Sequence, residues 1–411
     1  MIQGPDPSSK SFFRTARYRL FWVSSLFSNM GTMMQQIAQP WVLLSLNSSP
    51  FWVGLDSFAL NAPSLCFTLF GGVLADRFDR KKTVLFFQTI QFLCVLSMIL
   101  LLVLGLLKVW IIVLISFLIG LTDSLSMPSF QSIIPSLVRP GDIPRAVSFN
   151  SAQFNLSRTL GPAIAGVVIV RFGVLACFGA NAVSYIPFFL SLYFICPRGS
   201  EKLKKEPPAG EPLKEIQQFR TLFRNREVRL PLLTTFVNMF FCGPLITFCA
   251  VLIRNVFQES IENFGGAMAA FGIGGLLGAA SSFFVTPGRF RRNEIASGFA
   301  VLMGLLVLII SLNHSLVLLI LLLVLAGAAL TASNIFVNSF LQENTTNLMR
   351  GRIASLFQLA ISGGISIGAL FTGLLVAQFG ISTALTIDGL LALCLQLTLF
   401  RQQIRNSSLK K

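Results

Sequence analysis

The sequence predicts an all-α polytopic membrane protein with twelve transmembrane helices in two six-helix bundles. Its composition, the spacing of its apolar runs and an internal repeat support this prediction. Of the 411 residues, 54% are hydrophobic and only 12% are charged. A soluble domain would carry roughly twice that charged fraction, and so much apolar surface could not be hidden inside a water-soluble globule. These values exclude an ordinary soluble enzyme, a disordered regulator and a nucleic-acid-binding domain.

Twelve apolar runs follow one another along the chain. Each is long enough for a transmembrane helix, which takes about 20 residues. The runs are too long and too continuously apolar for the alternating strands of a membrane barrel. The expected spans lie at about 20–45, 51–75, 84–107, 110–130, 147–170, 174–195, 230–253, 264–285, 295–312, 315–340, 353–377 and 382–400.

The basic residues predict the orientation of the chain. If both termini are inside, 28 of the 32 Lys and Arg residues fall in the predicted inner segments, and only Lys108, Arg171 and Arg254 fall outside. Cytoplasmic loops retain Lys and Arg, so topology alone accounts for the net charge of +16. No nucleic-acid partner is expected, and both termini are predicted to be cytoplasmic.

One long connection, residues 196–229, separates an N-terminal bundle (1–195) from a C-terminal bundle (230–411). It contains Pro207, Pro208 and Pro212. Between Leu213 and Phe223, apolar residues recur at helical spacing among basic ones, which predicts an amphipathic helix on the inner membrane surface. We interpret this segment as a tether between the halves, with a partner-docking site as the alternative.

An internal repeat supports the division into halves. A shift of 207 residues aligns the fourth and fifth spans with the tenth and eleventh, with ten identities over 56 positions. Both copies run in the same direction, so the repeat is parallel, about an axis normal to the membrane. The identical residues include Gly120 and Gly327, Gly161 and Gly368, Gly166 and Gly373, and Gly173 and Gly380.

The loop between the second and third spans carries an ordered motif, G-x-L-A-D-R-x-x-R-K, from Gly72 to Lys81. Gly72 is expected to let its helix approach a neighbour closely. Asp76 is placed to accept hydrogen bonds from the N-terminal end of another helix, and Arg77 and Arg80 lie at the headgroup layer. The motif resembles the signature loop of the major facilitator superfamily, with Asp79 where Gly is usual, and residues 288–292 form a degenerate second copy. The resemblance implies the major facilitator fold and a gating role for Gly72, Asp76, Arg77 and Arg80.

Residues 31–41 and 150–166 resemble a narrower group, the bacterial exporters that include the enterobactin exporter and macrolide-efflux-type permeases. This resemblance implies a bacterial inner-membrane antiporter that exports siderophore-like or drug-like molecules, with proton coupling and no cofactor. Residues 109–130 contain no Lys or Arg, whereas many proton-coupled drug antiporters carry an Arg there, so the coupling mechanism stays open. No G-x-x-x-x-G-K-[ST] motif supports direct use of ATP.

Two charged residues fall within predicted spans, where burial in lipid costs several kcal/mol. Arg158 lies near the middle of the fifth span and Asp123 within the fourth, and the repeat places Ile365 and Leu330 at the equivalent positions. The shared scaffold therefore needs neither charge. Either the two form a structural ion pair, or they contact substrate or protons.

Polar residues within the spans are candidates for a substrate cavity, which helices one, four, seven and ten surround in the resembled family. Helix–helix hydrogen bonds are the alternative role for each. Asp56 and Asp388, nearer the outer ends of their spans, are expected to be exposed to water. The candidates are Gln35, Gln39, Asp123, Gln153, Asn155, Arg158, Asn238, Asn334 and Asn338.

Together these features predict a secondary active transporter that exports small organic molecules by alternating access. The expected partners are a small-molecule substrate, membrane lipid and protons. The seven cysteines form no C-x-x-C and the single histidine is His314, so no metal site is expected. No paired carboxylates or nucleophile–base set suggests an enzyme. A lipid or lysophospholipid flippase and a non-transporting membrane sensor on the same scaffold remain alternatives.

Overall fold

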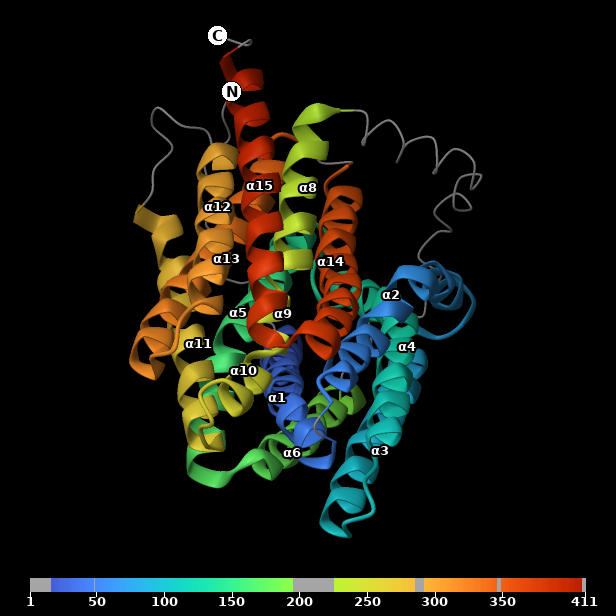
Figure 1. The fold of residues 1–411 in the computed structure, drawn as a ribbon. Helices are drawn as coiled ribbons and strands as arrows, with labels where there is room; N and C mark the ends of the chain where they lie inside the picture. The colour runs from blue at the N-terminus through green and yellow to red at the C-terminus, as the bar shows by residue number, and fades with distance from the viewer. Residues whose placement is uncertain (1–15, 48, 195–224, 285–291, 346–348, 409–411) are drawn as a thin grey trace.

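The computed structural model describes residues 16–47, 49–194, 225–284, 292–345 and 349–408, and this part of the chain contains helices but no strand. The helices form one bundle (Figure 1). The first half contains α1 (Ala16–Leu46), α2 (Phe51–Arg77), α3 (Arg80–Val103), α4 (Val109–Ile133), the 3-10 turns η2 (Ile134–Leu137) and η3 (Pro140–Asp142), α5 (Ile143–Phe172) and α6 (Val174–Phe194). The second half contains α8 (Arg226–Phe241), α9 (Pro244–Thr247), α10 (Cys249–Asn255), α11 (Ile261–Phe284), α12 (Arg292–Ser311), α13 (Leu316–Glu343), α14 (Arg350–Phe379) and α15 (Ile381–Ser408).

Nine helical segments of the described residues are long and apolar enough to cross a membrane. They are α3, α4, α6, α8 with α9, and α11 to α15. The remaining long helices, α1, α2 and α5, have 31, 27 and 30 residues and are not among these nine segments. α1 and α5 carry the Gln and Asn residues noted above, and all three pack along neighbours in the bundle. With these three, the described residues have helices at all twelve of the expected positions.

The seventh span is not one continuous helix. α8 ends at Phe241 and a short turn, α9, precedes α10. Pro244 lacks the backbone N–H that a continuous helix would need at that position. α8 begins at Arg226, four residues inside the range predicted for the linker. The predicted amphipathic helix lies outside the described residues.

The packing of the helices follows the predicted repeat. In the first half α2 packs on α4, α3 on α4 and α1 on α5; in the second half α11 packs on α13, α12 on α13 and α8 on α14. The halves meet along two equivalent pairs, α2 with α14 and α5 with α11, which lie side by side in Figure 1. The parallel two-fold relation predicted from sequence is confirmed.

The repeated glycines explain why the repeat can be detected in the sequence. Gly166 on α5 packs against Gly265 of α11, and its counterpart Gly373 on α14 packs against Gly54 of α2. A side chain at either position would meet the backbone of the opposite half. Gly173 and Gly380, with φ of 76° and 80°, end α5 and α14 in a backbone conformation that favours glycine.

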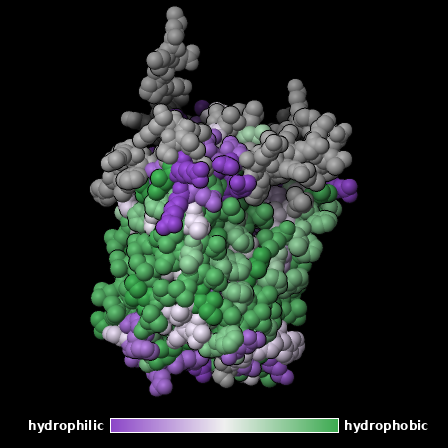
Figure 2. All heavy atoms as spheres, turned by 45° about the horizontal axis from the view of Figure 1, so that its top comes forward, coloured by the Kyte–Doolittle hydropathy of each residue, from purple (hydrophilic) through white to green (hydrophobic). Residues whose placement is uncertain are grey.

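A broad apolar belt surrounds the molecule, with polar residues at both ends (Figure 2). Large apolar side chains such as Phe86, Leu100, Val167 and Leu321 are 57–63% exposed on its surface. So extensive an exposed apolar surface is stable in lipid and not in water. The end where α1 begins and α15 ends is called the termini end below, and the opposite end is called the far end.

Candidate functional site

The two halves touch along the far half of their helices. On α2 and α14 the contacts run from Gly54 with Gly373 to Leu65 with Gly363, near the midpoint of both helices. On α5 and α11 they run from Gly166 with Gly265 to Thr159 with Gly275. At the far end Trp41 of α1 stacks on Phe264 of α11 with ring centroids 5.3 Å apart, and Arg254 donates a hydrogen bond to the Leu44 carbonyl.

One face of α1 shows that this contact ends midway. Met34 and Ala38, on the far half of this face, are 5% and 0% exposed within the main core. Leu20, Val23 and Phe27, which continue the same face toward the termini end, are 38–54% exposed. From these exposures we infer that the halves separate toward the termini end and leave a cleft there, with an apolar wall on α1.

α5 presents a polar face to this cleft. Ser151, Asn155 and Arg158 follow each other at intervals of four and three residues and so share a helix face; the first two are exposed and Arg158 is half-buried. The opposite face carries exposed Leu156 and Val167, which point toward lipid. Arg158 precedes Thr159, which lies beside Gly275 of α11, so we place the guanidinium at the bottom of the cleft, next to the contact between the halves.

Asp123 of α4 is also exposed. It lies on the opposite face of α4 from the exposed apolar Trp110, Leu114 and Phe117. Among the described residues no ion pair joins Asp123 to Arg158. The predicted structural pair is therefore absent in this conformation, and both charges are available to a ligand.

Four of the predicted cavity residues are corrected for this conformation, because each is buried. Gln35, Gln39, Gln153 and Asn238 are 0–5% exposed. Gln35 accepts a 2.7 Å hydrogen bond from Asn181 of α6, and Gln39 binds residues of α2 and α4. Helix–helix hydrogen bonding, the alternative role, therefore describes Gln35 and Gln39. Gln153 and Asn238 retain buried side-chain atoms without a protein partner in the described structure.

The two predicted cavity residues of α13, Asn334 and Asn338, are both half-buried. Asn338 accepts a 3.0 Å hydrogen bond from Gln342, whereas Oδ1 of Asn334 is buried without a partner in the described residues. In the first half, Arg158 is half-buried to a similar degree, whereas Asn155 and Asp123 are exposed.

Sequence reasoning missed two buried carboxyl groups. Asp56 and Asp388 were expected to be exposed to water, but they are only 6% and 0% exposed. Asp56 accepts hydrogen bonds from Gln39 and Ser116, and Asp388 accepts a 2.7 Å hydrogen bond from Thr372. Position along a helix indicates depth in the membrane, but it does not show whether a side chain points between helices.

The structure revises the role of one residue in the predicted gating loop. No atom lies within 4 Å of a Cβ added at Gly72. The close approach involves Gly71 instead, whose Cβ would lie 2.7 Å from the Ser124 carbonyl oxygen of α4. The side chain of Asp76 lies outside the described residues, and Arg77 is exposed. The gating role of the loop stays a prediction.

Two other motif residues hold the loop within its own half. Asp79, at the position where the motif usually has Gly, caps α3 by accepting a 2.8 Å hydrogen bond from the Lys82 amide, an arrangement that satisfies a free helix N–H. Arg80 donates a 3.3 Å hydrogen bond to the Ser132 carbonyl near the end of α4.

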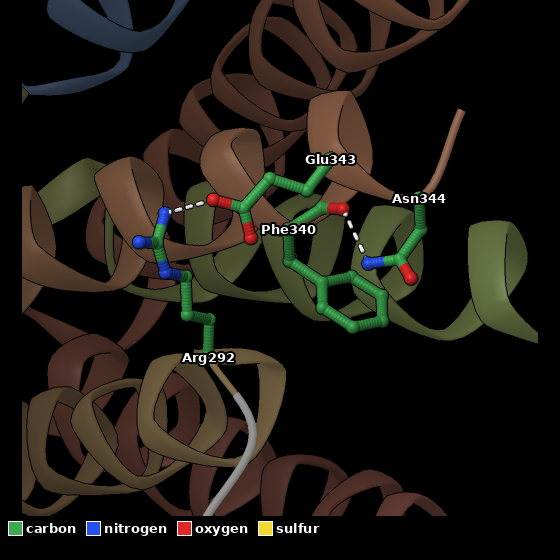
Figure 3. Close-up of polar contacts among 4 residues, drawn as sticks. All are labelled: Arg292, Phe340, Glu343 and Asn344. Atoms are coloured by element: carbon green, nitrogen blue, oxygen red, sulfur yellow. Dashed lines mark hydrogen bonds and ion pairs between the residues drawn. The ribbon is translucent and has the colours of Figure 1, made fainter. Parts of the chain in front are cut away.

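The degenerate copy in the second half makes the equivalent contact. Arg292, which corresponds to Arg80 in the motif, begins α12 and pairs with Glu343 at the end of α13 (Figure 3). Asn344 caps the same helix end by donating a 2.9 Å hydrogen bond to the Phe340 carbonyl. In each half, an arginine at the start of the third helix therefore ties it to the end of the fourth.

Comparison with known proteins agrees with this architecture. The family model described as transmembrane secretion effector matches residues 7–410. The chain is 24% identical to the staphyloferrin A transporter of Staphylococcus aureus, over 93% of this chain and 95% of that protein. It is 25% identical to an enterobactin exporter, EntS, of Escherichia coli, over 87% and 84% of the two chains.

A solved structure shows the same fold. The bacterial homologue of the human lysosomal transporter Spinster, described as inward-facing and unoccupied, superposes with a TM-score of 0.72 at 15% identity, and the match covers 97% of both chains. The family match spans nearly the whole chain, and the apolar belt and two-fold repeat fit it. The chain thus belongs to the transmembrane secretion effector family of the major facilitator superfamily, and it is a multi-pass bacterial membrane protein that acts as a secondary transporter of small molecules.

Proposed function

We propose that the protein exports small amphipathic organic anions from the cytoplasm across the inner membrane by alternating access, coupled to proton entry. The observation that carries this proposal is Arg158, which lies at the bottom of the cleft without a carboxylate partner among the described residues. A guanidinium keeps its charge at any relevant pH and binds carboxylate oxygens well. An anionic substrate would supply its missing partner.

The cleft also suggests why the substrate should be amphipathic. Leu20, Val23 and Phe27 form an apolar wall, while Asn155 and Arg158 supply polar contacts. Sites with an apolar lining and a few well-placed polar groups are typical of small-molecule binding. The relatives named for staphyloferrin A and enterobactin favour a siderophore-like molecule within this class.

The direction of transport depends on the orientation of the bundle, which can be tested by labelling. We propose that the termini end is cytoplasmic. A cysteine replacing the exposed Gln402 near the end of α15 should then react with a membrane-impermeant maleimide only in inverted vesicles. A cysteine replacing His314, exposed at the far end, should react only in intact spheroplasts. The opposite pattern would reverse the proposed direction.

The function itself is tested by measuring which metabolites cells retain. Cells with the wild-type gene, with the gene deleted and with the deletion complemented are compared by mass spectrometry of washed cells and medium. We expect one or a few organic anions to accumulate several-fold inside the deletion strain and to return to the medium on complementation. Changed lipid distribution between leaflets without such accumulation would indicate a flippase, and no change in either would indicate a sensor.

A further inference from the structure

Asp56 of α2 is buried at the centre of a hydrogen-bonded group that contains no cation. Oδ1 of its carboxyl accepts a 2.6 Å hydrogen bond from the Ser116 hydroxyl of α4, and Oδ2 accepts a 2.6 Å hydrogen bond from Nε2 of Gln39 on α1. Nε2 of Gln39 also donates to Ser116 at 2.8 Å. Burial of a charged carboxylate costs free energy unless a cation offsets it, and the described residues place no Lys, Arg or His in an ion pair with it.

The same turn of α2 makes the contact that closes the far end. Gly54 and Phe58 lie two residues before and after Asp56, and so face nearly opposite to it on the helix. A Cβ at Gly54 would lie 2.5 Å from the Ala369 carbonyl oxygen of α14, and the Phe58 carbonyl accepts a 3.3 Å hydrogen bond from Ser366. This contact between α2 and α14 is called the far seam below. α2 therefore binds its own half through Asp56 and the opposite half through the residues on either side.

A chain of amides leads from Asp56 toward the termini end. Gln35 donates to Oε1 of Gln39 at 3.4 Å, Asn181 donates to Gln35 at 2.7 Å, and Thr32, which is half-buried, donates to Asn181 at 3.4 Å. The present hydrogen bonds suit an ionised carboxylate, because both oxygens accept. A proton on Oδ2 would require the Gln39 amide to turn and accept it, and the turn would alter the bond to Gln35. The two protonation states thus have different hydrogen-bond patterns.

None of the charged groups on the surrounding helices forms an ion pair with Asp56 among the described residues. Asp123 lies on α4 seven residues beyond Ser116, about 10 Å along the helix, and Lys108 is exposed at the far end of the same helix. Arg254 of α10 is bound to the Leu44 carbonyl. The other basic residues on α1, α2, α3 and α14 lie at the termini end: Arg17, Arg19, Arg77, Arg80, Lys81, Lys82, Arg350 and Arg352.

We propose that Asp56 is a proton-binding site whose occupancy controls the far seam. When the seam is open, the carboxylate takes a proton from hydronium of the far-side solvent and releases water. The neutral carboxyl can then be buried, which favours closure. Loss of the proton after closure gives the hydrogen-bond pattern seen here, in which both oxygens of Asp56 accept. It leaves a buried negative charge with no neighbouring cation, which favours reopening of the seam. The proposal deepens the proposed proton-coupled export and rests on it for its physiological role.

The test follows the seam directly and needs no substrate. Nitroxide labels are attached to cysteines that replace Leu106 and Phe379, which are 60% and 58% exposed at the far ends of the two halves. Serines replace Cys66, Cys196 and Cys394 to prevent unwanted labelling. Distances are measured by double electron–electron resonance on the purified full chain between pH 5 and pH 8. The ratio of short to long distances should rise about tenfold or more on acidification, since one fully linked proton changes an equilibrium by up to tenfold per pH unit.

Four variants, including Asp388→Asn at the other buried carboxyl, decide whether Asp56 is responsible. Asp56→Asn should hold the seam in the short-distance state at every pH, whereas Asp56→Glu, which keeps a titratable group if Asn fails to fold, should retain a pH response. Asp142→Asn removes a carboxylate paired with Arg145 at the termini end and should leave the wild-type response unchanged. A full pH response in Asp56→Asn, its loss only in Asp388→Asn, or no response in the wild type would each overturn the proposal. None of these outcomes affects the retention assay, which tests export independently.

Discussion

Replacing Arg158 with Gln is expected to abolish export while the protein still folds and inserts. The guanidinium is at the bottom of the cleft and lacks an ion-pair partner in the described structure, so its removal leaves no buried carboxylate unpaired. Loss of a charged hydrogen bond to substrate costs about 1.5–3 kcal/mol, which corresponds to roughly a 10- to 150-fold loss of affinity. The retention assay should show accumulation close to that of the deletion strain.

Matched variants separate substrate contact from a general charge effect. Arg171→Gln removes an exposed arginine from the far end of the same helix and should leave export unchanged. Arg158→Lys keeps the charge but loses the paired N–H geometry, so partial export is expected. The double variant Asp123→Asn with Arg158→Gln should fold and stay inactive. Recovery of near-wild-type export in the double variant would show that the two charges serve only as a structural pair in another state.

Replacing Gly54 with Val should prevent closure of the far seam. A Cβ there would lie 2.5 Å from the Ala369 carbonyl oxygen, 3.0 Å from Cα of Gly373 and 3.2 Å from the Phe248 ring. Two of these are backbone atoms, which cannot turn aside as a flexible side chain can. Overpacking of this kind costs about 1–3 kcal/mol, or roughly a 5- to 150-fold shift toward the open seam.

The Leu106–Phe379 label pair measures this shift directly. Gly54→Val should populate mainly long distances at all pH values, and the retention assay should show loss of export because alternating access requires both states. Gly179→Ala on α6 provides the control, because a Cβ there meets no atom within 4 Å. If Gly54→Val keeps the wild-type distances and export, the seam does not depend on this contact.

The sequence alone predicts the fold well, for a physical reason. Apolar runs must be helices when they cross lipid, because the backbone has no water with which to form hydrogen bonds. The placement of charges and the recurrence of Gly166 as Gly373 after 207 residues can also be read directly from the sequence. The structure gives these two glycines equivalent roles, since each lies where one half touches the other. The repeat is detectable because close backbone contact restricts the choice of residue.

The candidate site could be predicted only in part. Arg158 and Asp123 stand out as candidates because a charge within an apolar run is costly wherever it points. Gln35 and Gln39 could not be assigned from sequence, because an amide can line a cleft or join helices at the same depth. Their actual partners, Asn181, Asp56 and Ser116, lie on other helices.

By itself, the sequence determined that this protein lies in a membrane, crosses it twelve times and repeats its first half in its second. These properties depend on composition and period, which each segment carries independently of the others. Only the tertiary structure decided that the halves close at the far end, that Gly71 rather than Gly72 packs tightly, and that Asp56 is buried against α1 and α4. These properties depend on which faces of separate helices meet, and that is set by packing between segments far apart in the chain.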